Sequence, residues 1–209
     1  MIQTQNVVFS YSEQQQFQFP NIDCANGNTL LITGNSGTGK TTLLHLLGGL
    51  LQPTSGEILI NNQNIQQLST SKLDAFRGKS IGMILQKSFF IEALTVLDNV
   101  ILASWLVKGT NAKQKALEIL DNLGLKNQVH KLPNQLSIGQ QQRVNIARAL
   151  INNPSVILAD EPTSSLDDEN ALIVARLLQD LAKKHQSSLI IVTHDQRLKA
   201  LFNHQISLS

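Results

Sequence analysis

A glycine-rich loop between two apolar runs constrains the fold of this chain more than any other feature. Residues 29–33 before it (TLLIT) favour a buried strand, and residues 43–47 after it (LLHLL) favour a helix. A strand, a G-x-x-x-x-G-K-[ST] loop and a helix together form a phosphate-binding unit, so the sequence predicts an α/β fold built around one. The loop itself consists of Gly34, Asn35, Ser36, Gly37, Thr38, Gly39, Lys40, Thr41 and Thr42.

Each residue type in this loop has a chemical reason to be there. Glycines allow the backbone to turn tightly and to direct its N–H groups at an anion, and the following helix adds the positive end of its dipole. Lys40 would reach the terminal phosphates as a cation, and the Thr41 hydroxyl would be a ligand for Mg²⁺. An ordinary Gly/Ser/Thr turn would not explain the Lys-Thr pair. The loop therefore predicts binding of a nucleoside triphosphate.

Composition excludes several classes of protein. A chain of 209 residues with 42% hydrophobic residues fits one α/β domain, and its net charge of +2 with mixed signs lacks the basic stripe of a nucleic-acid binder. The single cysteine, Cys24, forms no internal disulfide and is expected to be a small buried residue. No signal pattern and no apolar run of about 20 residues is present, so we expect a soluble chain.

Apolar and polar periodicity predicts strands that alternate with helices. Alternation at residues 5–11 and 16–19 predicts two strands joined by a polar turn. Further strands are expected at residues 29–33, 57–60, 80–85, 156–159 and 189–193. Helical patterns occupy residues 71–76 and 95–123, begin again at Ser137 and at Asp167 or Asp168, and end with a short helix capped by Asp195. This order predicts a mainly parallel sheet with right-handed crossovers.

Two carboxylates follow the apolar strand at residues 156–159. The carboxyl end of a buried strand is where α/β proteins bind their ligands, so Asp160 and Glu161 are candidates for chemistry. Asp160 would hold Mg²⁺, and Glu161 would polarise the water that attacks a γ-phosphate. A solvated Asp-Glu pair is the alternative, and the four apolar residues directly before the pair argue against it.

Residues 136–143 (LSIGQQQR) predict a second anion site. Ser137 and Gln140 have the spacing of a capping box, and a serine cap followed by Gly139 makes the helix N-terminus available to an anion. The phosphates at residues 34–42 already have their own helix, so this second site requires a different anion. One arrangement that supplies it is ATP held between two subunits.

These motifs, in this order, resemble those of the ATP-binding cassette (ABC) ATPases over essentially all 209 residues. The resemblance implies a P-loop NTPase fold for residues 1–209 as a single domain, with a mainly parallel core sheet, an N-terminal antiparallel β-subdomain and a helical subdomain at about residues 87–153. It assigns Tyr11 to adenine stacking, residues 34–42 to Walker A, Gln86 to a Mg²⁺ and water contact, Ser137, Gly139 and Gln140 to the signature, Asp160 and Glu161 to Walker B, residues 164–167 to the D-loop and His194 to a γ-phosphate contact.

Three of these residues have simpler interpretations when they are taken alone. Tyr11 at a strand end is consistent with packing, Gln86 with a turn, and His194 with a core histidine whose hydrogen bonds are satisfied. The ordered set of motifs favours the nucleotide contacts over these alternatives. One departure from the family is Ile138, where the signature usually has glycine. Its backbone N–H at the first helical position is retained, while its β-branched side chain would narrow a dimer interface.

The resemblance is strongest to small bacterial ATPases of the lipoprotein-releasing and macrolide-exporter type. It implies a head-to-tail homodimer that hydrolyses ATP with Mg²⁺ and drives a separate integral-membrane permease, on the inner face of the cytoplasmic membrane. Export or extraction of a lipoprotein, peptide or drug is the implied function, with a periplasmic adaptor reached through the permease. The alternative is regulation of a membrane complex in cell-envelope or division function.

Other classes of ABC protein fit less well. DNA-repair and chromosome ATPases need a long coiled coil between Lys40 and Asp160, where no sustained heptads occur, and translation factors join two cassettes in one chain. A switch that hardly hydrolyses ATP is disfavoured by Glu161. The apolar residues soon after Gln86 are interpreted either as a permease-docking surface or as packing of the helical subdomain; they are Phe89, Phe90, Ile91 and Leu94.

Overall fold

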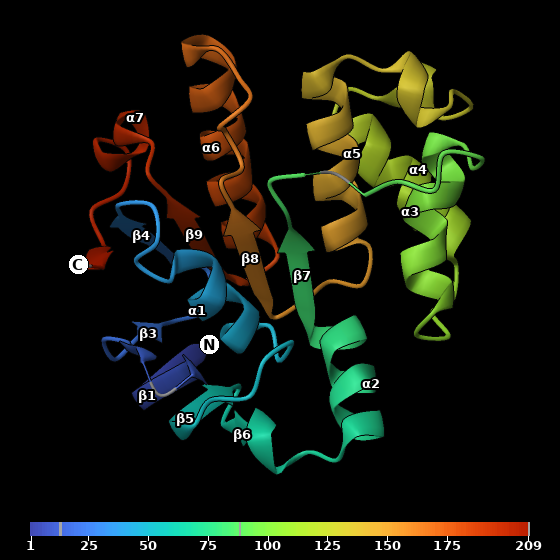
Figure 1. The fold of residues 1–209 in the computed structure, drawn as a ribbon. Coiled ribbons are helices and arrows are strands. Elements are labelled where there is room, and N and C mark those ends of the chain that lie inside the picture. The colour runs from blue at the N-terminus through green and yellow to red at the C-terminus, as the bar shows by residue number, and fades with distance from the viewer. Residues whose placement is uncertain (13, 88, 209) are drawn as a thin grey trace.

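The computed structural model describes residues 1–12, 14–87 and 89–208, and two sheets organise them (Figure 1). The antiparallel sheet has the order β2-β1-β5-β6, with β3 paired to β1; its strands are β1 (Ile2–Ser12), β2 (Gln15–Gln18), β3 (Asp23–Cys24), β5 (Ser55–Ile60) and β6 (Gln63–Asn64). The parallel sheet has the order β10-β4-β9-β8-β7; its strands are β4 (Thr29–Gly34), β7 (Ile81–Ile84), β8 (Val156–Asp160), β9 (Ser188–Thr193) and β10 (Gln205–Leu208). The predicted fold class is confirmed.

Both faces of the parallel sheet are covered, which explains its nearly continuous apolar strands. In β8, Val156 and Leu158 belong to the cluster that contains α1 (Lys40–Leu47) and the antiparallel sheet. Ile157 and Ala159, which point to the opposite face, belong to the cluster that contains the larger helices. The sheet is therefore the central layer of the molecule.

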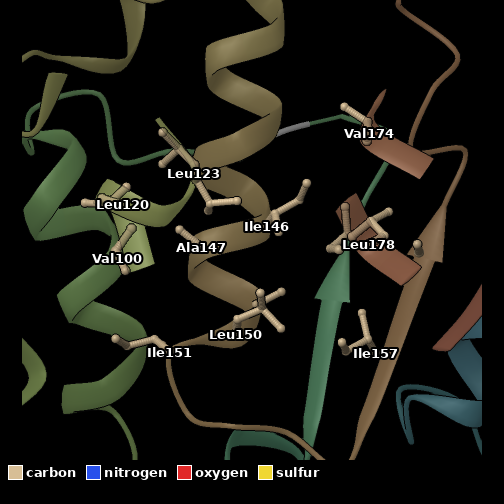
Figure 2. Packing of buried hydrophobic residues seen from close by; sticks show 14 of the residues in the cluster. Val100, Leu120, Leu123, Ile146, Ala147, Leu150, Ile151, Ile157, Val174 and Leu178 are labelled. Carbon is tan, nitrogen blue, oxygen red and sulfur yellow. The ribbon is translucent and has the colours of Figure 1, made fainter. Parts of the chain in front are cut away.

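Three helices pack together beyond β7, which is the edge strand of the parallel sheet farthest from β4 (Figure 1). They are α3 (Val96–Trp105), α4 (Ala112–Asn122) and α5 (Ile138–Leu150). Figure 2 shows Val100 and Leu120 facing the apolar side of α5, while Leu178 of α6 (Asp168–Lys184) approaches the same core from the sheet side. The remaining elements are α2 (Thr70–Ser80), α7 (Gln196–Lys199) and the short helices η1 (Ile65–Gln67), η2 (Lys126–Gln128) and η3 (Pro133–Gln135).

The structure corrects two details of the predicted elements and decides a third. The helical pattern at residues 95–123 is two helices, because Lys108 and Asn111 have φ of 56° and 54° and interrupt it. Strand β10 was not predicted, because its four residues alternate only weakly and it is held by parallel pairing with β4. Asp167, and not Asp168, caps α6 by accepting a hydrogen bond from the Asn170 N–H.

The register of the parallel strands places their carboxyl ends at one edge of the sheet. Thr33 of β4 lies opposite Thr193 of β9, and Val192 of β9 lies opposite Asp160 of β8. The residues that follow these strands therefore meet at that edge, as α/β topology requires of a ligand site. Among the described residues, no helix combines the length and the apolarity needed to cross a membrane.

The buried cysteine gives the first testable prediction. Cys24 is 1% exposed, its thiol lies 3.9 Å from the carbonyl oxygen of Leu189, and burial raises its pKa to about 11. Because the thiolate is the reactive form, we expect a colorimetric thiol reagent to leave the folded protein unmodified at about pH 8 and to titrate one thiol in denaturant. Rapid modification of the folded protein would contradict this burial.

Candidate active site

A cleft of about 390 Å³ lies at the carboxyl edge of the parallel sheet. It brings together most of the predicted nucleotide contacts from the loop after β4, the strand β1 and the segments that follow β7, β8 and β9. Its lining consists of Tyr11, Gln15, Phe17, Ser36, Gly37, Gly39, Lys40, Thr41, Thr42, Gln86, Glu161 and His194. Gln15 and Phe17 were not predicted, because a short exposed strand carries no signal for ligand contact.

The glycine-rich loop has the backbone that the sequence requires. Gly37 and Gly39 both have φ of 86°, and a Cβ at Gly39 would lie 2.8 Å from the Phe17 ring, so a side chain is excluded there. Lys40 is 9% exposed, and its Nζ donates hydrogen bonds of 2.8 Å to the carbonyl oxygens of Gly34 and Asn35. The ammonium group is thus held inside the loop, at the start of α1. An anion bound there would be attracted both by the Lys40 charge and by the positive end of the helix dipole.

Thr41 lines the cleft and contacts Asp160, which is buried and does not line the cleft itself. The Thr41 hydroxyl donates to Asp160 Oδ2 at 3.2 Å, and burial raises the pKa of Asp160 above its usual range. A hydroxyl beside one carboxylate is the donor set with which proteins hold Mg²⁺ when phosphate oxygens complete the coordination. Among the described residues, no group of three or more His, Cys, Asp or Glu residues could hold a metal alone. These residues therefore fit a Mg²⁺ ion that arrives with a nucleotide.

Glu161 occupies the most constrained position of the site. Its φ of 46° is unusual for a residue with a side chain, and its N–H donates to the Val192 carbonyl oxygen at 2.9 Å. One carboxylate oxygen accepts a 2.7 Å hydrogen bond from the Thr193 hydroxyl. The other accepts from the His194 N–H at 3.1 Å and lies 2.6 Å from His194 Nδ1. The carboxylate is thus fixed by the end of β9, and it faces the same cleft as the phosphate loop.

A second group of polar residues is hydrogen-bonded to Glu161 through Thr193. Sequence analysis did not predict this group as part of the site. The Thr193 hydroxyl accepts from the Asp195 N–H at 3.0 Å, and Asp195 Oδ2 accepts from the Thr163 hydroxyl at 2.9 Å. Asp195 also caps α7, as the sequence indicates, and binds the Arg197 guanidinium. Sequence reasoning could not identify this group, because its members are ordinary polar residues that only the fold brings together.

Tyr11 and Gln86 lie at the rim of the cleft. Tyr11 is 55% exposed; its hydroxyl is 3.2 Å from Thr42 Oγ1, and its ring meets the Phe9 ring edge-on with a centroid separation of 4.7 Å. The Phe17 ring also meets it edge-on, at a centroid separation of 6.3 Å, so two neighbouring rings orient this exposed aromatic side chain. The Gln86 amide donates to Ser164 Oγ at 3.5 Å, so it joins the segment after β7 to the loop after Glu161.

The N-terminus of α5 borders this cleft without lining it. Ile138 lines a neighbouring pocket together with Gln86 and Glu161, which both line the cleft. The predicted capping box is present: Ser137 Oγ accepts from the Gln140 N–H at 3.3 Å, and Gln140 Oε1 accepts from the Ser137 N–H at 3.1 Å. None of the predicted contacts Ser137, Gly139 and Gln140 lines the cleft of its own chain. A Cβ at Gly139 would meet nothing within 4 Å, and Ile138 is 62% exposed. Packing within one chain therefore does not explain the glycine.

Comparison with known proteins decides the family. The sequence profile of the ABC transporter family matches residues 17–164. The chain belongs to the ABC transporter family. As an ABC ATPase it is an ATP-binding enzyme that hydrolyses ATP, and the resemblance of its motifs to this family is confirmed.

Relatives cover almost the whole chain. The lipoprotein-releasing system ATP-binding protein LolD of Psychrobacter arcticus is 43% identical over 87% of this chain and 82% of its own length. The LolD protein of Bacteroides fragilis is 38% identical over 100% of this chain and 97% of its own length. A dimeric structure of the bacterial ABC transporter cassette MJ0796 superposes with a TM-score of 0.87 at 36% identity, over 100% of this chain and 94% of that one. A post-hydrolysis dimer of the same cassette, bound to ADP and phosphate, gives 0.88 at 35% identity with the same coverage.

The Asp195 carboxylate predicts a pH dependence of stability. Its hydrogen bond with the Arg197 guanidinium holds its pKa below the usual range. The ionised Asp195 carboxylate therefore contributes fully to the free energy of unfolding above its unfolded-state pKa of about 3.9. This contribution is lost as the pH falls below that value toward the folded-state pKa. We expect Asp195→Asn to flatten the acid limb of the free energy of unfolding against pH below about pH 4, measured with denaturant. Asp180→Asn, at an exposed position on α6, is the control, and equal slopes for all three proteins would refute the assignment.

Proposed function

We propose that this chain is the ATPase subunit of a lipoprotein-releasing type ABC transporter, and that two copies close head to tail over two ATP molecules. The observation that carries the proposal is the N-terminus of α5. It offers a capped helix end, a glycine without an intrachain packing reason and an exposed Ile138, and none of these lines the cleft of its own chain. Glycine weakens a helix by about 0.5–1 kcal/mol relative to alanine, so a close approach by another molecule is the physical reason to have it.

The geometry of the pairing follows from the two anion sites. Each ATP would take its phosphate contacts from residues 34–42 of one copy and its remaining contact from Ser137, Gly139 and Gln140 of the other. The backbone N–H groups of both helix N-termini point at an anion, and the two dipoles act on it together. Because each copy contributes one half of each site, the interface is self-complementary and closes as a dimer.

Within each site we assign roles from the positions of the side chains. Tyr11 stacks on the adenine, and Lys40 leaves the carbonyl oxygens of Gly34 and Asn35 to bind the terminal phosphates. Thr41 and Asp160 would hold Mg²⁺, with Gln86 as a further ligand, and a bound ion would supply positive charge beside the phosphate oxygens. A nucleotide with these contacts is positioned for in-line attack by water, which is the main requirement of phosphoryl transfer.

Glu161 orients and polarises the attacking water. Its carboxylate already accepts hydrogen bonds from Thr193 and His194, and the lone pairs that remain can accept from a water. His194 Nδ1 faces Glu161, which leaves Nε2 for the γ-phosphate. The fixed position of Glu161 means that little reorganisation is needed at the moment of reaction.

Substitution of the general base tests the chemistry. Glu161→Gln keeps the shape of the side chain and removes the basic oxygen, so phosphate release should fall by about a hundredfold or more. ATP binding should persist, and with Mg²⁺ and ATP the variant should elute at twice the mass of the single chain. Near-normal phosphate release from this variant would mean that another group orients the water.

Ile138, the unusual residue of the signature, gives a second test of the proposed closure of two copies over ATP. The exposed side chain of Ile138 would lie in the proposed interface, where a β-branched group keeps the two copies apart. We expect Ile138→Gly to raise kcat by about threefold or more, which corresponds to about 0.7 kcal/mol of barrier. Steady-state turnover measures it, with Ile173→Gly on the exposed face of α6 as the control. An unchanged kcat would count against this steric role.

A permease would dock beside α3. Phe89 is 60% exposed and Ile91 48%, and nearby a groove of about 790 Å³ between α3 and α4 is lined by Trp105 and Leu117. We assign residues 87–153 to a helical subdomain that contacts the permease at the inner face of the membrane, with any periplasmic adaptor reached through that permease. The names of the LolD relatives support lipoprotein as the cargo.

Phe89, and not Phe90, is the residue with which to test docking. Phe90 packs against the core and lies under the Arg148 guanidinium at 5.5 Å from the ring centroid, so a charge there would disturb folding. Phe89→Asp should abolish co-purification of the permease, because it places a charge in an apolar contact, and should keep the melting temperature within a few degrees. Ile173→Asp is the matched control. Normal co-purification of Phe89→Asp would remove this docking surface.

A further inference from the structure

The Arg197 side chain bridges two segments near the active site: the residues that follow β8 and the residues that follow β9. Arg197, on α7, donates to Asp195 Oδ1 from Nε at 2.8 Å and to Asp195 Oδ2 from a terminal nitrogen at 2.7 Å. The same guanidinium donates to Asp168 Oδ1 at 2.5 Å and to the carbonyl oxygens of Leu166 at 3.4 Å and Thr163 at 3.5 Å. Arg197 therefore ties the segment after His194 to the whole of residues 163–168.

The bridge continues to the carboxylate of Glu161 through buried groups. Asp195 is linked by its backbone N–H to the Thr193 hydroxyl, which donates to Glu161 Oε2. Asp195 also accepts from the Thr163 hydroxyl, and both Thr163 and Thr193 are fully buried. Buried, satisfied polar networks are rigid, since a displaced member leaves its partner without a hydrogen bond. A displacement of residues 163–168 thus reaches Glu161 by one continuous path.

We propose that Arg197 is a positioning residue that makes residues 163–168 and the His194 segment move as one body. This inference rests on the proposed two-copy function, because a second copy would contact the exposed residues of this segment. Ser164 and Ser165 are exposed and line the pocket that Ile138 also lines, next to the cleft. Closure of the second copy on this loop then sets the position of Glu161, so hydrolysis at one site depends on occupancy of the other. We call the bridge that Arg197 makes with Asp195 and Asp168 the latch. The molecule that acts on the latch is a second copy of this chain.

The chemistry of the latch requires arginine. The planar guanidinium presents a fixed fork of donors that meets Asp195 with two bonds and still reaches Asp168 and two carbonyl oxygens. A lysine could satisfy one of these acceptors at a time. A neutral side chain would leave the Asp195 carboxylate, which is 9% exposed, without its cation. Arg197 does not line the nucleotide cleft, so its loss should leave ATP binding intact.

The test compares kcat, KM and the Hill coefficient for ATP in full-chain variants, alone and with the permease. Arg197→Gln should lower kcat by about tenfold and bring the Hill coefficient toward one, with KM within about twofold, because only the positioning of Glu161 is affected. Arg197→Lys should recover part of kcat. Arg176→Gln, on the exposed face of α6, is the control for loss of one surface arginine and should match the wild type.

A double-mutant cycle separates positioning from general stability. Asp168 is 90% exposed, so Asp168→Asn should keep the fold, lower the Hill coefficient and add nothing in the Arg197→Gln background. Should Arg197→Gln fail to fold, Arg197→Lys and Asp168→Asn carry the same readouts. Wild-type kcat and Hill coefficient in these variants, or strictly additive losses, would overturn the latch while ATP turnover still supports the proposed function. A wild-type chain without turnover or ATP-dependent dimers would overturn the proposed function, and the latch with it.

Discussion

The register of three parallel strands is the constraint on which the site depends. Pairing of β4 with β9 and of β9 with β8 brings the phosphate loop, His194 and the Asp160-Glu161 pair to the same edge of the sheet. A slip of one residue would exchange the two faces of a strand and break both clusters of buried side chains. The apolar packing that fixes the register therefore also fixes the distance between the phosphates and Glu161.

Much of this arrangement could be predicted because the decisive signals are local. The loop at residues 34–42 needs glycines and a lysine at fixed spacing, and the strands around it are apolar on both faces, so each pattern identifies its own structure. The capping box at Ser137 is equally local and is present. Asp160 at the end of β8 and Glu161 directly after it can be interpreted because the whole of this strand is buried.

The features that could not be predicted from the sequence are those that depend on tertiary contacts. The positive φ of Glu161 and its bond from Thr193 arise where β8 and β9 end side by side, which no periodicity records. Arg197 resembles any surface arginine until Asp195 and Asp168 are brought to it. Strand β10 forms by parallel pairing with β4, and two residues with positive φ divide the helical pattern at residues 95–123. Tertiary context decides each of these.

The most direct test of the account is a disulfide between the two anion sites. Ser36 and Ser137 are both exposed, and the native Cys24 is buried, so a Ser36→Cys chain and a differently tagged Ser137→Cys chain can be mixed and oxidised. A disulfide requires Cα atoms within about 7 Å. Head-to-tail closure over ATP predicts a cross-link between the two tagged chains that forms only with Mg²⁺ and a non-hydrolysable nucleotide. Absence of this link, or links only between identical chains, would contradict head-to-tail closure over ATP.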